Sequence, residues 1–104
     1  MKIVQIVPNE GEKLYDDLVK KQGEIRKKGR GTFRRTGRAA RSSATWKHKA
    51  YRGSVALKRG PSGSVTAKIR APAHDREWQM LSAFLGFVDR HLDSKVSSIT
   101  IDYR

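Results

Sequence analysis

Arginines at near-helical spacing are the feature of this sequence best suited to chemistry. Arg26, Arg30, Arg34, Arg38 and Arg41 follow one another at intervals of 4, 4, 4 and 3 residues. On a helix this spacing would align the five side chains in one stripe. A guanidinium group stays charged and donates two parallel hydrogen bonds to a phosphate or carboxylate. The series therefore predicts contacts with a polyanion.

The other basic residues gather around this series. Between Lys20 and Arg52 there are thirteen Lys and Arg residues against one acidic residue, Glu24, which gives this segment a net charge of +12. The whole chain of 104 residues has a net charge of +13, so the other 71 residues are almost neutral. A general requirement for solubility would not concentrate charge in this way.

Aromatic rings lie between these cations, and nucleic-acid bases could stack on them. Trp46 and Tyr51 fall in a stretch with strand character, where core packing is the alternative interpretation. We predict a nucleic-acid interface with Phe33, Trp46, His48 and Tyr51 as its candidate stacking residues. Its predicted cations are Arg26, Lys27, Lys28, Arg30, Arg34, Arg35, Arg38, Arg41, Lys47, Lys49 and Arg52.

Catalytic and metal chemistry have no comparable set of residues. His48, His74 and His91 show no metal-ligand spacing, and the chain contains no cysteine. Asp16 and Asp17 are adjacent on an expected helix and so point to different sides, and the spacing yields no converging carboxylates of the kind a nuclease needs. We therefore expect a protein that is not an enzyme and that uses no cofactor, metal or small-molecule ligand.

The first half of the chain predicts a strand, a helix and a basic arm. The apolar run over 2–7 is typical of a strand covered on both sides. Asn9 is expected to cap a helix that runs from about 10 to 28 and stops at Gly29. Residues 29–44 have three glycines and a single large apolar residue, so we expect a flexible arm there.

The second half predicts strands around one apolar helix. Residues 45–59 have strand character, with Gly53 as a candidate bulge, and a turn over 60–63 leads to a strand over 64–71. The remaining expectations are a helix over 75–93 capped by Asp75 and a last strand over 96–104 with Ile99, Ile101 and Tyr103 pointing inward.

The element order β-α-β-β-α-β favours a single α+β domain over residues 1–104. We expect a four-stranded antiparallel sheet with both helices on one face, which is the ferredoxin-like split βαβ arrangement with a long basic loop. Its first and third strands are central. The other face of the sheet should be polar and mildly basic, with Thr66, Lys68, Arg70, Thr100 and Arg104.

These features predict a nucleic-acid-binding protein that grips phosphates. A glycine- and arginine-rich arm on a compact domain resembles the extensions of ribosomal proteins, which favours RNA or a ribonucleoprotein over DNA. One alternative is a protein-interaction module whose arm binds an acidic partner and whose apolar helix 75–93 forms a homodimer. Another is an enzyme that uses the arm as a substrate clamp. With no apolar run of 18 residues and no signal-peptide cleavage site, we expect a cytoplasmic protein without a membrane partner.

Overall fold

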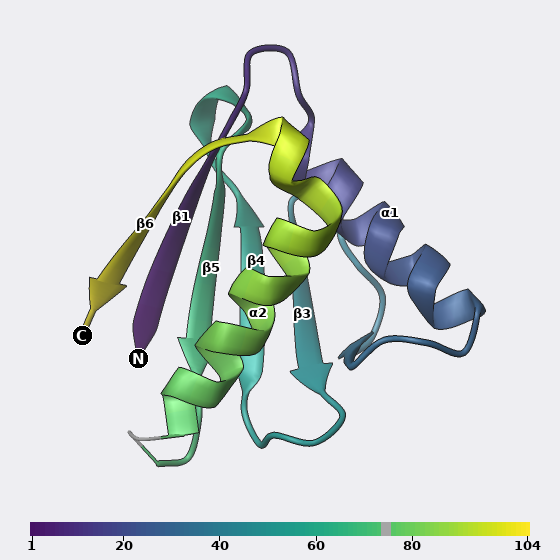
Figure 1. Cartoon of the computed structure of the whole chain (residues 1–104), viewed down its shortest axis with the longest axis vertical. Coiled ribbons are helices and arrows are strands. Elements are labelled where there is room, and N and C mark those ends of the chain that lie inside the picture. Colours follow the sequence, from purple (N-terminus) through teal and green to yellow (C-terminus); the bar gives the residue numbers. More distant parts are fainter. Residues whose placement is uncertain (74–75) are drawn as a thin grey trace.

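A six-stranded antiparallel sheet and two helices make up the fold in the computed structural model, which describes residues 1–73 and 76–104 (Figure 1). The strand order across the sheet is β2-β3-β4-β5-β1-β6. The strands are β1 (Lys2–Pro8), β2 (Phe33–Arg35), β3 (Ser43–His48), β4 (Ser54–Arg59), β5 (Val65–Arg70) and β6 (Val96–Tyr103), and the helices are α1 (Leu14–Lys27) and α2 (Glu77–Leu92).

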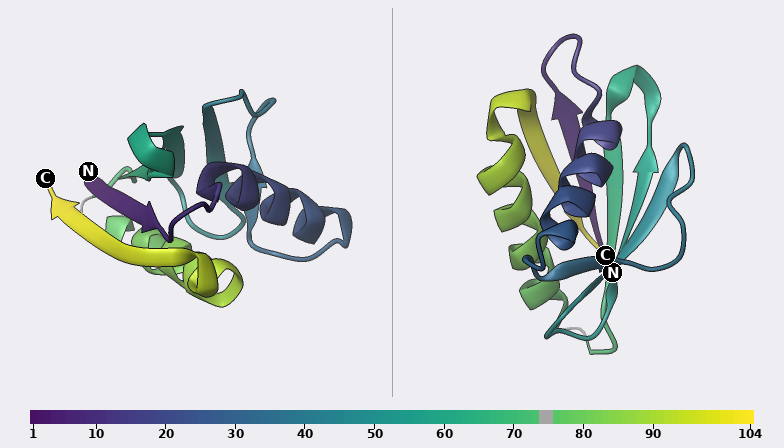
Figure 2. Two further views of the ribbon diagram at one scale, coloured as in Figure 1. Left: turned by 90° about the horizontal axis from the view of Figure 1, so that it is seen from above. Right: turned by 90° about the vertical axis from the view of Figure 1, so that its right-hand side faces the viewer.

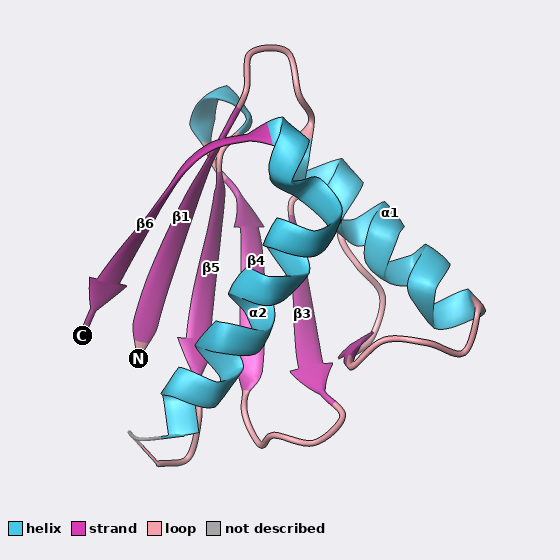
Figure 3. Ribbon diagram, viewed as in Figure 1, coloured by secondary structure: helices cyan, strands magenta, loops and turns pink. Residues whose placement is uncertain are grey.

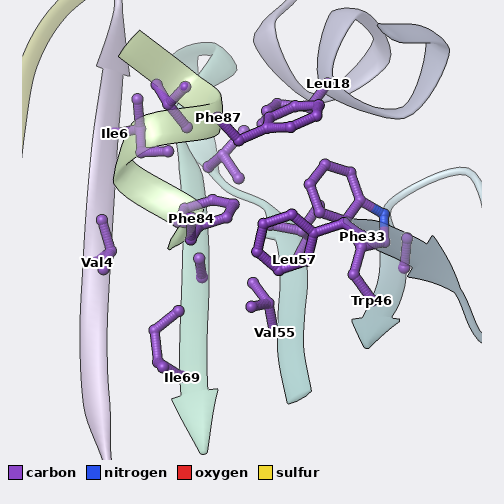
Figure 4. Packing of buried hydrophobic residues seen from close by; sticks show 14 of the residues in the cluster. Val4, Ile6, Leu18, Phe33, Trp46, Val55, Leu57, Ile69, Phe84 and Phe87 are labelled. Atoms are coloured by element: carbon purple, nitrogen blue, oxygen red, sulfur yellow. The ribbon is translucent and has the colours of Figure 1, made fainter. Parts of the chain in front are cut away.

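Both helices lie on the same face of the sheet, and the core fills the space between the two layers (Figures 2 and 3). Alternate strand residues point to the helices because side chains along a strand alternate between the two faces of the sheet. In β1, Val4 and Ile6 are fully buried, whereas Val7 is 45% exposed. The prediction that the first strand is covered on both sides is therefore wrong. The labelled side chains of the core converge between sheet and helices (Figure 4).

The α+β class is confirmed, but the four-stranded layout is not matched, because two further strands extend the sheet. The stretch expected as one strand over 45–59 divides into β3 and β4, and Gly53 lies in the turn between them rather than in a strand bulge. Part of the expected arm forms β2, which pairs with β3. The expected first and third strands do lie side by side, as β1 and β5, away from the sheet edges.

The helix boundaries differ from the expected ones at the N-terminal ends. Helix α1 begins at Leu14, and Asn9 does not cap it. Instead, the Asn9 side-chain amide donates to the carbonyl oxygen of Ser94 at 2.8 Å and so joins the end of β1 to the start of β6. The predicted stop is confirmed, since Gly29 follows the helix with a φ of +70°. Asp75, the expected cap of the second helix, lies outside the described residues.

A buried ion pair holds the start of α2 against β1. The Glu77 carboxylate lies 3.2 Å from Lys2 Nζ and also contacts the N-terminal amine of Met1. Its hydrogen bond to that amine, with a further contribution from Lys2, lowers the pKa of Glu77 against the opposing effect of burial. This ion pair fixes the level at which α2 crosses the sheet.

The last strand departs most from its expected burial. Of the three residues expected to point inward, only Ile101 packs against the core. Ile99 is 38% exposed and Tyr103 is 65% exposed, because β6 is the outermost strand and α2 does not cover it. On the helix-free face, Lys68, Arg70 and Thr100 are exposed, as the alternating pattern predicts.

Candidate nucleic-acid interface

The segment expected to be a flexible arm contributes a ring to the core. Phe33 is 4% exposed, and its ring centre lies 5.7 Å from that of Trp46 and 6.1 Å from that of Phe87. Its carbonyl oxygen accepts a hydrogen bond of 3.1 Å from the Gln22 side-chain amide of α1. Strand β2 is therefore attached both to the core and to the first helix.

Further hydrogen bonds attach the rest of this segment to the body. The Tyr15 hydroxyl donates to the carbonyl oxygen of Ala40 at 2.8 Å. The backbone N–H of Thr36 donates to Thr45, and the N–H of Lys49 donates to Thr32. These contacts place the cations of residues 26–52 on a defined surface.

All eleven cations predicted for the interface are exposed. Within residues 1–73 and 76–104, none of them forms an ion pair with a carboxylate. The two aspartates in the first turn of α1 have partners outside the basic segment, since Asp16 pairs with Arg59 at 2.6 Å and Asp17 pairs with Lys95 at 3.1 Å. The second half of α1 is therefore strongly basic and ends on Arg26 and Lys27, and Glu24 is its one carboxylate.

A basic groove of about 790 Å³ runs between α1 and β2. Its cations are Lys20, Arg26, Lys27, Arg34 and Arg35, and its one acidic residue is Glu24. The sequence-based prediction leaves out Lys20 because the arginine series starts six residues later. The helical repeat carries the missing signal: Lys20, Gly23 and Lys27 are three and four residues apart and so share one side of α1.

A second hollow, of about 340 Å³, lies beside the turn between β3 and β4. Its cations are Arg34, Lys47, Lys49 and Arg52. Arg34 lines both hollows and connects them into one basic path. In the β2–β3 pairing, Arg34 lies directly opposite Lys47, so two positive charges face each other across the strands. Such a like-charge pair opposes strand pairing.

One exposed ring lies on this path. The Tyr51 ring stacks on the His48 ring, with ring centres 4.3 Å apart and planes 17° apart, and Tyr51 is 37% exposed. Nδ1 of His48 accepts the backbone N–H groups of Ala50 at 2.9 Å and Tyr51 at 3.1 Å, which fixes the turn. Burial lowers the pKa of His48 and so keeps this nitrogen free to accept.

Six of the predicted interface residues lie away from the path. Phe33 and Trp46 are buried in the core, so neither ring has a face open to a base. Among the described residues, the buried Trp46 indole N–H has no hydrogen-bond partner. The cations Lys28, Arg30, Arg38 and Arg41 are exposed but line neither hollow. The structure thus brings together seven of the eleven cations: Arg26, Lys27, Arg34, Arg35, Lys47, Lys49 and Arg52.

His48 and His91, the two histidines in the described part of the chain, have separate surroundings. His91 packs edge-on against Phe87, with ring centres 4.9 Å apart, while His48 belongs to the β3–β4 turn. His74 lies outside the described part of the chain. In the rest, no three His, Asp or Glu side chains are grouped as metal ligands would be.

Comparison with protein-family models, with curated proteins and with solved structures finds no match to this chain. None of the described helices is long and apolar enough to cross a membrane.

Proposed function

We propose that the chain is a non-enzymatic nucleic-acid-binding protein, with RNA or a ribonucleoprotein preferred, that grips phosphates along the basic path. The observation that carries this proposal is the pair Arg34 and Lys47, which lie opposite each other on neighbouring strands and have no carboxylate partner among the described residues. Opposite residues in an antiparallel pair are roughly 5 Å apart at Cβ, so one phosphate can contact both side chains.

The geometry of the path suits a chain of phosphates better than one anion. The groove beside α1 and the hollow beside the β3–β4 turn share Arg34 and extend on either side of it. Successive phosphates of one strand can therefore occupy successive groups of cations. The C-terminal end of α1 carries a negative partial charge that opposes phosphate binding, and Arg26 and Lys27 in the last turn offset it.

Tyr51 favours an unpaired strand over a duplex. Its ring lies among Lys47, Lys49 and Arg52, so a base stacked on it would have its phosphate within the same hollow. Bases that are splayed out and available for stacking are typical of single-stranded RNA regions. The duplex keeps its bases stacked internally and offers the path only its backbone.

The proposal is tested by binding of labelled single-stranded RNA, duplex RNA and duplex DNA, measured by fluorescence anisotropy across a salt series. The double variant Arg34→Gln, Lys47→Gln removes two charges from the path. The control Arg38→Gln, Arg41→Gln removes two charges from outside it. We expect the first variant to reduce the steepness of log K against log salt by about 1.4 for a single strand, and the control to change it far less.

The Arg34 and Lys47 variant changes two exposed side chains and leaves the core residue Phe33 in place. Equal effects of the two double variants would mean that the charge acts without a defined path and would overturn the proposal in this form. Binding that disappears near physiological salt would also contradict it and would favour an acidic protein as the partner.

A further inference from the structure

The sheet ends at β6, and the backbone of this strand has hydrogen-bonding groups that face away from the sheet. Met1 and Arg104 bond to each other through both their backbone groups, at 3.0 and 3.1 Å. Such pairs alternate along an antiparallel ladder, so Asp102 and Thr100 also bond toward β1. The backbone groups of the residues between them, Ile99, Ile101 and Tyr103, therefore point to the free edge.

The same three residues carry apolar side chains on the helix face of the sheet. Ile99 and Tyr103 are exposed, and Ile101 is half-buried. At the Tyr103 end, Lys2 Nζ lies 5.4 Å from the Tyr103 ring centre and also pairs with Glu77 at the start of α2. An unpaired edge and exposed apolar side chains thus coincide.

Strand β6 has little protection against pairing with another strand, since Asp102 is its one charged residue and pairs with Arg104. It is eight residues long and contains neither proline nor lysine, the residues that commonly protect an edge. The one irregularity of its pairing lies at the far end, between Val7 and Pro8 of β1. Among the described elements, the helices leave this edge uncovered (Figure 2).

The charge distribution indicates which partner the β6 edge can bind. The chain carries +13 overall, but residues 93–104 have two acidic and two basic side chains and are neutral. Asp102 pairs with Arg104 and Lys95 pairs with Asp17. The basic segment lies at the opposite end of the sheet, on and around β2 and β3 (Figure 1). This edge is therefore where two copies of a strongly basic chain meet with least repulsion, and it gives a polyanion no grip.

We propose that two copies of the chain associate through β6, strand against strand, with a two-fold axis at Ile101. In this antiparallel register, Ile101 lies opposite Ile101 of the second copy, and Ile99 lies opposite Tyr103. It is the register that pairs all three apolar residues with apolar residues on the same face. On the other face, Thr100 lies opposite Asp102, and Ser98 lies opposite Arg104, so no two like charges meet.

The backbone pattern agrees with this register. Ile101 bonds to its own symmetry mate, and Ile99 bonds to Tyr103, through the groups that point to the edge. A contact of this kind uses the same surface of both copies and closes on itself, so it stops at two chains. The product is a continuous sheet across both copies with the two basic paths at its opposite ends.

The experiment is sedimentation analysis of the full chain at about 0.15 M salt, where the repulsion between distant surface charges is largely screened. We expect the wild type to approach twice the 11.8 kDa mass of one chain as concentration rises. Ile99→Lys should weaken association at least about tenfold, and so should Tyr103→Glu. The double variant should regain most of the association, because lysine and glutamate then face each other across the axis.

The matched control is Val7→Lys, which adds one lysine at an exposed apolar residue of the neighbouring strand, on the opposite face. It should leave association unchanged. Circular dichroism melts establish that each variant folds. A monomeric wild type at all concentrations would overturn the proposal, as would a dimer that ignores Ile99→Lys. A folded double variant as weakly associated as either single variant would exclude the register at Ile101.

Discussion

At the scale of single residues, His48 makes the stability of the fold depend on pH. Its neutral ring accepts two backbone N–H groups through Nδ1, packs edge-on against Phe33 at 5.2 Å and supports the ring of Tyr51. Burial lowers its folded pKa below the ordinary value of 6.5. The unfolded chain therefore takes up a proton at higher pH than the folded chain, and stability declines as pH falls below 6.5.

The substitution His48→Phe distinguishes the packing role of the His48 ring from its role as a hydrogen-bond acceptor. It keeps an aromatic ring against Tyr51 and removes the acceptor of two part-buried backbone N–H groups, which should cost about 0.5–1.5 kcal/mol at neutral pH. The stability of the variant should also fall less steeply with decreasing pH, because the contribution of His48 is gone. The contribution of His91, whose pKa is also lowered by burial, should remain. Urea unfolding of both proteins from about pH 8 to about pH 5 measures this difference. Identical pH profiles would show that His48 does not hold the turn.

At the scale of elements, the turn between β3 and β4 depends on one glycine. Gly53 has a φ of +130°, and a Cβ atom there would lie 2.2 Å from the backbone oxygen of Arg70. That oxygen belongs to β5 and cannot move without distorting the strand. Gly53→Ala should therefore displace the turn that carries Tyr51 and Arg52.

Gly37 provides the control for this substitution. It has a φ of +70°, but a Cβ atom added there would have no neighbour within 4 Å, so an alanine meets only the backbone penalty. We expect Gly37→Ala to lower the free energy of unfolding by about 1 kcal/mol and Gly53→Ala by at least twice as much. Chemical denaturation measures both, and equal losses would contradict the assigned close contact.

The elements also show how far the sequence predicts this fold. Clear alternation, as in residues 65–70, and the apolar periodicity of α2 predict these elements to within two residues of their ends. Strand β2 escapes prediction because three residues, two of them arginines, give no periodic signal. It forms because Phe33 reaches Trp46 and Phe87, a contact between distant segments that local sequence does not encode.

The candidate site, like the fold, is predicted from the sequence only in part. The cluster of charge is evident from composition, and so are the individual cations. Which cations share a surface depends on how β2 pairs with β3 and on how close β2 lies to α1. The first brings Arg34 opposite Lys47, and the second places Arg34 and Lys20 in one groove. Trp46 is buried and Tyr51 is exposed because of the face of the strand or turn on which each residue lies. A small error in a predicted strand boundary or register would assign a residue to the wrong face.

The whole molecule separates a charged end from a neutral end. Residues around β2, β3 and α1 carry almost the entire net charge, whereas β6 lies at the other edge with balanced charges. This layout keeps the phosphate-binding path and the self-association edge apart. Association of two copies through β6 would place the two paths far from each other, so that one long polyanion could engage both and gain in avidity.

The concentration of charge also predicts how salt affects the free protein. Twelve net positive charges between residues 20 and 52 repel one another in the folded state, and Arg34 faces Lys47 within a strand pair. Sodium chloride should therefore raise the melting temperature of the free protein by screening this repulsion. The double variant Arg34→Gln, Lys47→Gln should have a higher melting temperature than the wild type already at low salt, with a gain of about 0.2–1 kcal/mol in the free energy of unfolding. The same variant should bind RNA more weakly.

Stability and binding would then change in opposite directions for the same two residues. Differential scanning fluorimetry across a chloride series measures the first effect, and the anisotropy series measures the second. The Arg38→Gln, Arg41→Gln variant again controls for total charge, since neither side chain faces a cation across a strand pair. A melting temperature that is independent of chloride, or a loss of stability in the Arg34 and Lys47 variant, would mean that these charges are already neutralised within the folded chain.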